Sequence, residues 1–263
     1  MPLGRARCPR KTSLQSVWSS RVTRVAVAVL CACTAPLASQ SPRIEDNSFL
    51  IEEAYNQERG VVQHISAWQR SLGSSAWDFA FTQEWPLVTQ QHQLSYTLLI
   101  GSTRNDVEFG GVGLNYRYQL LPADHRVALA PRLTALVPAH HEHLGVQLNV
   151  PVSVRVGSAF VAHANGGITQ TTRATTLYNL GGSVVWLARS TFNVLCEVVW
   201  AAEDGTHVLV LNPGIRWAHN FASGLQVVPG MAVTVGVGPS SGLEAAFLYL
   251  SFEHPFATQS GPN

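Results

Sequence analysis

The sequence GVQLNVPVSVR, from Gly145 to Arg155, alternates between apolar and polar residues. In an extended strand successive side chains point to opposite faces, so the apolar residues share one face and the polar residues share the other. The apolar face carries Val146, Leu148, Val150, Val152 and Val154, and the polar face carries Gln147, Asn149, Ser153 and Arg155. A soluble antiparallel strand shows the same pattern, so the fold class depends on how often it recurs.

The alternation recurs in about twelve segments separated by turn residues, at the spacing of tilted membrane strands of about 9 to 11 residues. The predicted strands are Val61–Arg70, Ala76–Trp85, Gln93–Ile100, Gly111–Leu120, Arg126–Val137, Gly145–Arg155, Ala159–Asn165, Thr176–Leu187, Phe192–Ala202, Val208–Ala218, Leu225–Val237 and Ala246–Phe256. Their polar faces carry Asn, Gln, Ser, Thr, Gly and Arg, as in an enclosed wet lumen, whereas a soluble sandwich covers its outside with Lys and Glu. Since a sheet in lipid must close to pair its backbone, we predict an all-β fold, a transmembrane antiparallel up-and-down β-barrel of about twelve strands.

Two other observations bear on this fold. Aromatic residues toward the strand ends favour membrane-interface girdles, although an ordinary aromatic core gives the same pattern. These residues are Trp77, Trp85, Tyr116, Tyr118, Trp186, Trp200 and Trp217. Four prolines argue against the barrel, because each falls inside a predicted strand and removes an N–H donor from its ladder. They are Pro131, Pro151, Pro213 and Pro229.

Composition limits the class of protein further. The chain is 46% hydrophobic and only 13% charged, yet no apolar run after residue 40 is long enough for a membrane helix. Residues 1–40 place basic residues before the apolar run Val25 to Ala32 and small residues after it, which predicts a cleaved secretory signal peptide. Six of the 17 basic residues lie there, so 11 remain against 16 acidic residues, about −5, which excludes a basic nucleic-acid footprint. Cys196 is then the only cysteine, so neither an intramolecular disulfide nor a cysteine metal site is expected.

The segment after the signal is acidic and does not alternate convincingly. It carries Glu45, Asp46, Glu52, Glu53 and Glu58. We expect residues 41–60 to form a separate N-terminal segment, residues 61–256 the barrel, and residues 257–263 a C-terminal extension. The acidic segment is either a solvated leader or a plug that folds back into the lumen.

Five arginines on the polar faces are candidates to line the pore: Arg117, Arg126, Arg132, Arg155 and Arg216. Enclosed like charges need counter-charges, which Glu84, Glu197, Glu253 and the acidic segment can supply. One hypothesis is that residues 44–58 enter the barrel, pair with these arginines and narrow or plug the pore. The alternative is that the arginines pair with wall carboxylates and brace the lumen.

No catalytic, cofactor or metal site is predicted. His140, His141, Glu142 and His143 are of metal-ligand type, but adjacent histidines in a turn point in different directions, so a solvated polar loop is preferred. His163 and Asn165 share a strand face, yet nothing marks a nucleophilic serine, so an outer-membrane hydrolase is the less favoured alternative. The prediction is therefore a protein that is not an enzyme.

Several motifs carry a family resemblance: DNSFLIEEAYNQE with GVVQHI, WDFAFTQEWP, GVGLNYRYQLL and FLYLSFEHPF. From Asp46 to Phe256 the chain resembles the outer-membrane β-barrel proteins grouped as transporters of the MetA pathway of phenol degradation. The resemblance implies architecture and location more than substrate, and suggests hydrophobic or aromatic compounds. The aromatic Phe256 also resembles the last strand that barrel-assembly machinery recognises, except that residues 257–263 extend past it.

Together these observations predict an integral outer-membrane protein of a Gram-negative bacterium, exported through its signal peptide, that passes small molecules passively in the manner of a porin. Its expected partners are outer-membrane lipid, the barrel-assembly machinery and a small-molecule solute, with no nucleic acid and no cofactor. The alternative is a barrel that conducts nothing and has a structural or assembly role.

Overall fold

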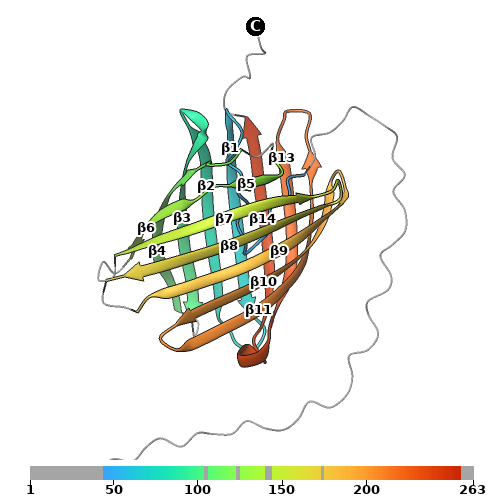
Figure 1. Cartoon of the computed structure of the whole chain (residues 1–263). Coiled ribbons are helices and arrows are strands. Elements are labelled where there is room, and N and C mark those ends of the chain that lie inside the picture. Colours follow the sequence, from blue (N-terminus) through green and yellow to red (C-terminus); the bar gives the residue numbers. More distant parts are fainter. Residues whose placement is uncertain (1–43, 104–105, 123–124, 140–143, 173–174, 256–263) are drawn as a thin grey trace, which may run out of the picture. The chain divides into compact units, whose positions relative to one another are not determined.

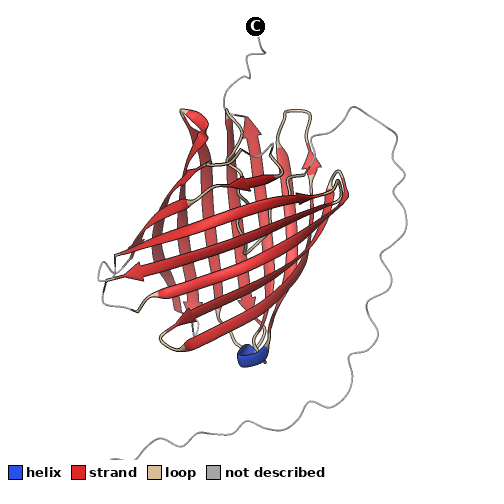
Figure 2. Ribbon diagram, viewed as in Figure 1, coloured by secondary structure: helices blue, strands red, loops and turns tan. Residues whose placement is uncertain are grey.

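The structure, a computed structural model, describes residues 44–103, 106–122, 125–139, 144–172 and 175–255. From Val61 on, these residues form strands joined by short connections, with one short 3-10 helix, η1 (Gly238–Ser240) (Figures 1 and 2). The strands are β1 (Val61–Ser71), β2 (Trp77–Leu87), β3 (Thr89–Thr103), β4 (Asp106–Tyr118), β5 (Val127–Leu129), β6 (Arg132–Pro138), β7 (Gly145–Val156), β8 (Phe160–Thr171), β9 (Leu177–Arg189), β10 (Phe192–Glu203), β11 (Thr206–Trp217), β12 (His219–Asn220), β13 (Gln226–Gly236) and β14 (Glu244–Pro255). No helix among these residues is long and apolar enough to cross a membrane.

The strands close into an antiparallel barrel. Apart from the short β5 and β12, each strand pairs with the next long strand on either side of it in the chain. β1 pairs with β14, and β11 pairs with β13. Two breaks explain why more than twelve strands carry labels: β5 and β6 occupy one place in the wall, and β12 is a short piece ahead of β13. The predicted barrel of about twelve antiparallel strands is confirmed.

The stretch Gly145 to Arg155, which lies in β7, shows how the alternating sequence forms the wall of the barrel. On β7, Val146 and Leu148 are 53% and 44% exposed on the outside, while Asn149 and Ser153 are 4% and 1% exposed. Most of the fully buried side chains elsewhere in the barrel are also polar, among them Gln63, Gln93, Asn193 and Asn212. The barrel therefore presents apolar residues outward and polar residues inward, opposite to a soluble protein.

The prolines that argued against the barrel lie where it tolerates them. Pro131 separates β5 from β6. Pro151, Pro213 and Pro229 each lie at a gap in one of their strand's two ladders, while the other ladder runs through without interruption. At such a gap no residue of the neighbouring strand pairs with the proline, so the missing proline N–H leaves no carbonyl oxygen without its donor.

Strand ends differ from prediction in several places, and β4, for example, begins at Asp106 and not at Gly111. The predicted strand Arg126–Val137 is broken, with Arg126 outside β5, and β3 is longer than Gln93–Ile100. β8 runs on to Thr171, beyond Asn165, because Gly166 and Gly167 keep partners on both sides of the ladder although they resemble turn residues. The side chains of Asn149 and Asn179 and the Leu148 carbonyl fill the space over Gly167, so a side chain at this one position would be crowded.

Residues 44–58, which we call the inner segment, lie inside the barrel. Neighbouring strands alternate in direction, so the start of β1, the end of β14 and the β9–β10 connection share one end, which we call the terminal rim. The Ile44 N–H donates to the Ser190 carbonyl in that connection at 2.9 Å, and Gly60 leads into β1. The inner segment therefore enters and leaves at the terminal rim and turns back inside the lumen.

Candidate functional site

The backbone of the inner segment is held by side chains of the wall. The N–H groups of Phe49, Leu50 and Ile51 all donate to Glu197 Oε1, at 3.0, 2.7 and 2.9 Å. Further donations run from Glu52 to Asn165 Oδ1 (2.6 Å), from Ala54 to Ser153 Oγ (2.8 Å), from Asn56 to Gln119 Oε1 (2.9 Å) and from Gln57 to Gln93 Oε1 (2.7 Å). An irregular segment has no ladder of its own, so the polar lumen supplies the partners that its buried backbone requires.

Two predicted arginines bind two predicted plug residues. Arg117 lies 3.2 Å from a Glu52 oxygen and 3.8 Å from a Glu53 oxygen, and Arg132 forms an ion pair with Glu52. Arg132 also donates to Asn115 and to two further wall side chains. Burial favours a raised pKa at Glu52, but the guanidinium groups of Arg132 and Arg117 outweigh it and hold the Glu52 pKa below its usual value. The carboxylate of Glu52 is thus held in its charged form against the wall.

Arg216 binds the inner segment differently from the predicted ion pairing. It is fully buried, and its Nη1 donates to the carbonyl oxygens of Asn47 at 2.5 Å and Glu45 at 3.4 Å. The guanidinium carbon lies 5.0 Å from the ring centroid of Tyr249. Among the described residues no carboxylate forms a salt bridge with Arg216, so it holds the entering chain through backbone carbonyls.

The remaining acidic candidates join the site indirectly. Glu84 accepts a hydrogen bond from Gln93 Nε2 at 2.8 Å, and Glu253 accepts one from Gln63 Nε2 at 2.5 Å. Both glutamines in turn contact Gln57 of the inner segment. Glu84 and Glu253 therefore form hydrogen bonds with glutamines and not with the arginines that the sequence suggested.

Four further candidates, like Arg216, Glu84 and Glu253, have no ion pair within the described part of the chain. Arg126, Arg155 and Glu58 are exposed near the terminal rim, where their charges face solvent. Asp46 is buried, and its contact with the wall is through its carbonyl oxygen, which lies 2.9 Å from His163 Nε2. The structure thus brings together only part of the predicted charge network.

Sequence reasoning missed the apolar contacts of the inner segment. The ring of Phe49 lies over Gly214 and Gly230, where an added Cβ would fall 2.6 and 2.7 Å from ring atoms. Ile51 occupies the space over Gly181 in the same way. Glycine within a strand often marks close approach by another chain segment, and that signal was present in the sequence.

The Phe49 ring has aromatic neighbours as well as the two glycines. Its centroid lies 5.2 Å from that of Phe247 and 5.3 Å from that of Tyr249, both at tilted angles. Gly214, Gly230, Phe247 and Tyr249 form this site, which we call the aromatic socket. Phe247 and Tyr249 belong to a buried apolar cluster against which Phe49 packs. A small apolar core therefore fixes the tip of the inner segment.

A serine and histidine pair also lies beneath the inner segment. Ser153 Oγ is 2.7 Å from His163 Nδ1, and the same oxygen accepts the Ala54 N–H. The Asn165 amide bonds to the backbone of Glu52 instead of orienting His163. The pair is buried and holds the inner segment, an arrangement that gives a substrate no access to the serine.

Cavities lie on either side of the inner segment. The cavity on the side away from the terminal rim has a volume of about 420 Å³ and is lined by Leu50, Leu99, Leu136 and Arg132, among others. A second, of about 280 Å³, lies near the terminal rim beside Tyr55 and Arg155. The inner segment thus separates two hollow parts of the lumen.

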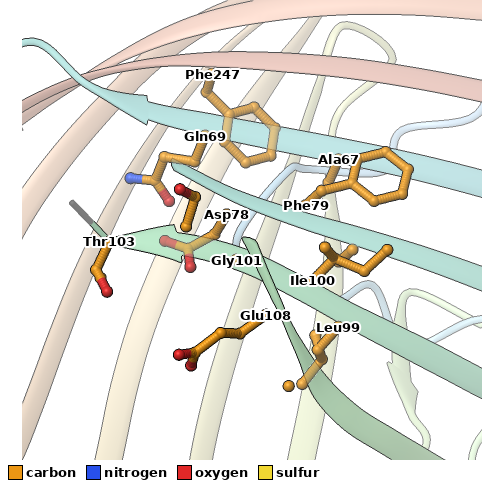
Figure 3. Close-up of a pocket in the computed structure, with 13 residues that line it drawn as sticks. Ala67, Gln69, Asp78, Phe79, Leu99, Ile100, Gly101, Thr103, Glu108 and Phe247 are labelled. Carbon is orange, nitrogen blue, oxygen red and sulfur yellow. The ribbon is translucent and has the colours of Figure 1, made fainter. Parts of the chain in front are cut away.

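A third cavity of about 500 Å³ lies at the end of the barrel opposite the terminal rim (Figure 3). Asp78 and Glu108 lie on either side of Gly101 in one register row of β2, β3 and β4. Figure 3 shows Gln69 and Thr103 beside them. We call this end of the barrel the far mouth. Its cavity is lined by two acidic residues and no arginine, so it carries negative charge.

No described group of three or more His, Cys, Asp or Glu side chains is placed to hold a metal ion. His140, His141, Glu142 and His143 lie outside the described residues, as do the predicted signal peptide, Phe256 and the C-terminal extension.

Comparison with known proteins supports the fold. A scan against protein-family models and a search of curated proteins found no match. Among solved structures, the chain is similar to the NanC porin, at 10% identity over 74% of this chain and 100% of that one, with a TM-score of 0.53. It is also similar to the KdgM porin, at 6% identity over 72% and 98%, with a TM-score of 0.53.

A third solved structure of this type is an outer membrane channel from Pseudomonas putida F1. It is 12% identical, the match covers 76% of this chain and 97% of that one, and the TM-score is 0.52. Identities this low show a shared fold. The chain therefore has the barrel fold of these porins and channels.

Proposed function

We propose that this protein is an outer-membrane channel for passive passage of small molecules, whose lumen is closed by the inner segment. The apolar outer face suits the hydrocarbon of a bilayer, and the barrel pairs its backbone internally, as lipid requires. The similar solved structures are porins and a channel, which adds support. A cleaved signal peptide, insertion by the barrel-assembly machinery and a lipid environment belong to the same proposal.

The observation that carries the proposal is the way the inner segment is attached. It is held by ion pairs, wall hydrogen bonds and the aromatic socket, all of them noncovalent and each replaceable by water or solute. Such an attachment makes residues 44–58 a removable plug. Hydrophobic or aromatic solutes are suggested by the motif resemblance and by the apolar side chains Leu50, Leu99 and Leu136 in the cavity of about 420 Å³.

The test is conductance in planar bilayers of the protein without residues 1–40, compared with a variant that also lacks residues 44–58. Steps that become larger or more frequent after the deletion support the plug. Heat-modifiable migration on gels verifies that both proteins contain a folded barrel.

Point variants refine this test. Glu52→Gln with Glu53→Gln removes the ion pairs to Arg117 and Arg132, and we expect more frequent opening. Glu58→Gln is the matched control because Glu58 is exposed and has no salt bridge in the described structure. Unchanged conductance in the double variant argues against the plug, and silence of all folded variants favours the non-conducting structural barrel.

The hydrolase remains the second alternative, and one observation bears on it. Ser153 and His163 form a hydrogen-bonded pair, but the inner segment covers it. Hydrolysis of a chromogenic ester by the deletion variant, abolished by Ser153→Ala, would support that alternative.

A further inference from the structure

Phe49 lies in its site as a bound ligand would. Its N–H donates to Glu197 at 3.0 Å while its ring fills the aromatic socket over Gly214 and Gly230. The covalent path from this nitrogen to the ring passes through two carbons, Cα and Cβ. The wall is thus shaped to hold an aromatic ring and an N–H donor at this separation.

Glu197 loses most of its partners when the inner segment leaves. Its Oε1 accepts three N–H groups from Phe49, Leu50 and Ile51, while Oε2 retains the Asn212 amide at 2.6 Å. The side chain is only 1% exposed. A carboxylate in such a place is stabilised by whatever replaces the lost donors, and an ammonium group carries three N–H groups and a compensating charge.

The charge at the far mouth favours a cation over an anion. Once the inner segment has left with its own acidic residues, the lumen wall holds Glu84, Glu197 and Glu253 beside Arg117, Arg132 and Arg216, so the charges of the wall balance. Asp78 and Glu108 add negative charge at the far mouth (Figure 3). A field of this sign concentrates cationic solutes at the entrance.

We propose that the site vacated by Phe49 binds arylethylamines, which are primary amines with an aromatic ring two carbons from the nitrogen. The ammonium replaces the backbone N–H groups on Glu197, and the ring replaces that of Phe49 in the aromatic socket. Binding competes with the inner segment and so holds the channel open. This inference rests on the proposed function, since it requires release of the inner segment.

The experiment measures the open fraction of the intact protein without residues 1–40 in planar bilayers while 2-phenylethylamine is added. We expect the open fraction to rise with amine concentration. Butylamine lacks the ring and 3-phenylpropionate lacks the ammonium, so each should be about tenfold or more weaker.

Two variants separate this site from the rest of the attachment. Glu197→Gln and Glu53→Gln both remove a contact of the inner segment, so both should open more often without ligand. Only Glu197→Gln removes the proposed ammonium site. The response to 2-phenylethylamine should therefore persist in Glu53→Gln and fall by about tenfold in Glu197→Gln.

Failure of this inference is distinguishable from failure of the proposed function. If Glu53→Gln opens but does not respond to 2-phenylethylamine, or if 3-phenylpropionate acts equally well, the arylethylamine site is overturned and the channel stands. A response that survives in Glu197→Gln overturns it too. If neither variant conducts, and the protein lacking residues 44–58 does not conduct either, the proposed channel function is contradicted. The arylethylamine site, which depends on that function, is then contradicted as well.

Discussion

The ring of Phe49 lies against Gly230 so closely that a methyl group on that glycine would fall 2.7 Å from Phe49 Cε1. This contact joins the tip of the inner segment to the wall of the barrel. The contact is possible because Gly230 has no side chain, so replacing Gly230 with alanine tests it.

Gly230→Ala should weaken the attachment of the inner segment by about 1–3 kcal/mol, the usual cost of overpacking a filled site. The open fraction in planar bilayers and the rate at which maleimide labels Ser48→Cys, in a Cys196→Ser background, should both increase. Gly166→Ala is the control, since its Cβ meets only Leu180 Cδ1 at 3.8 Å. If the two alanine variants behave alike, Phe49 does not occupy the socket.

Glu197→Gln replaces a charged acceptor of three backbone N–H groups with a neutral one. The expected loss is about 1–2 kcal/mol of attachment free energy, because hydrogen bonds to charged groups are stronger. Labelling of Ser48→Cys should accelerate by about tenfold. Glu244→Gln, an exposed position on β14, serves as control and should leave the rate unchanged.

Arg132 and Glu52 should be energetically coupled. Arg132→Met and Glu52→Gln each remove the same ion pair, so the double variant should cost less than the sum of the two single variants. We expect a coupling energy of about 0.5–3 kcal/mol, measured from the equilibrium accessibility of Cys at position 48. Arg155→Met paired with Glu52→Gln is the control cycle, for which strict additivity is expected because Arg155 has no salt bridge among the described residues.

A charged side chain on the outward face of the barrel should lower its free energy of unfolding. Leu180 on β9 is 59% exposed on the outside, and Leu180→Arg should destabilise the barrel in lipid vesicles by about 2–4 kcal/mol if this face meets hydrocarbon. Leu72 is 57% exposed but lies in the β1–β2 connection, so Leu72→Arg should cost about 0–1 kcal/mol. Guanidinium unfolding of both proteins in vesicles gives the comparison. Equal costs would place Leu180 in water.

Much of the fold could be predicted because strand alternation is local. Val146 to Val154 specify an apolar face by their spacing alone, and repetition of that spacing gives the number of strands in the wall. Strand ends were less certain, because Gly166 and Gly167 look like turn residues and only their ladder partners show otherwise.

The charge of the inner segment could also be read from the sequence, but its partners could not. Glu52 does meet Arg117 and Arg132, whereas Arg216 binds carbonyl oxygens and Arg155 faces solvent. Partner choice depends on the height of each residue along a tilted strand and on where the inner segment turns, and neither is a local property of the chain.

The sequence by itself thus determined a closed barrel with an acidic segment before it, because periodicity and composition act over a few residues. Only the tertiary structure decided that Phe49 lies over Gly214 and Gly230 with its N–H on Glu197. Those residues are separated by most of the chain, and barrel closure brings them together.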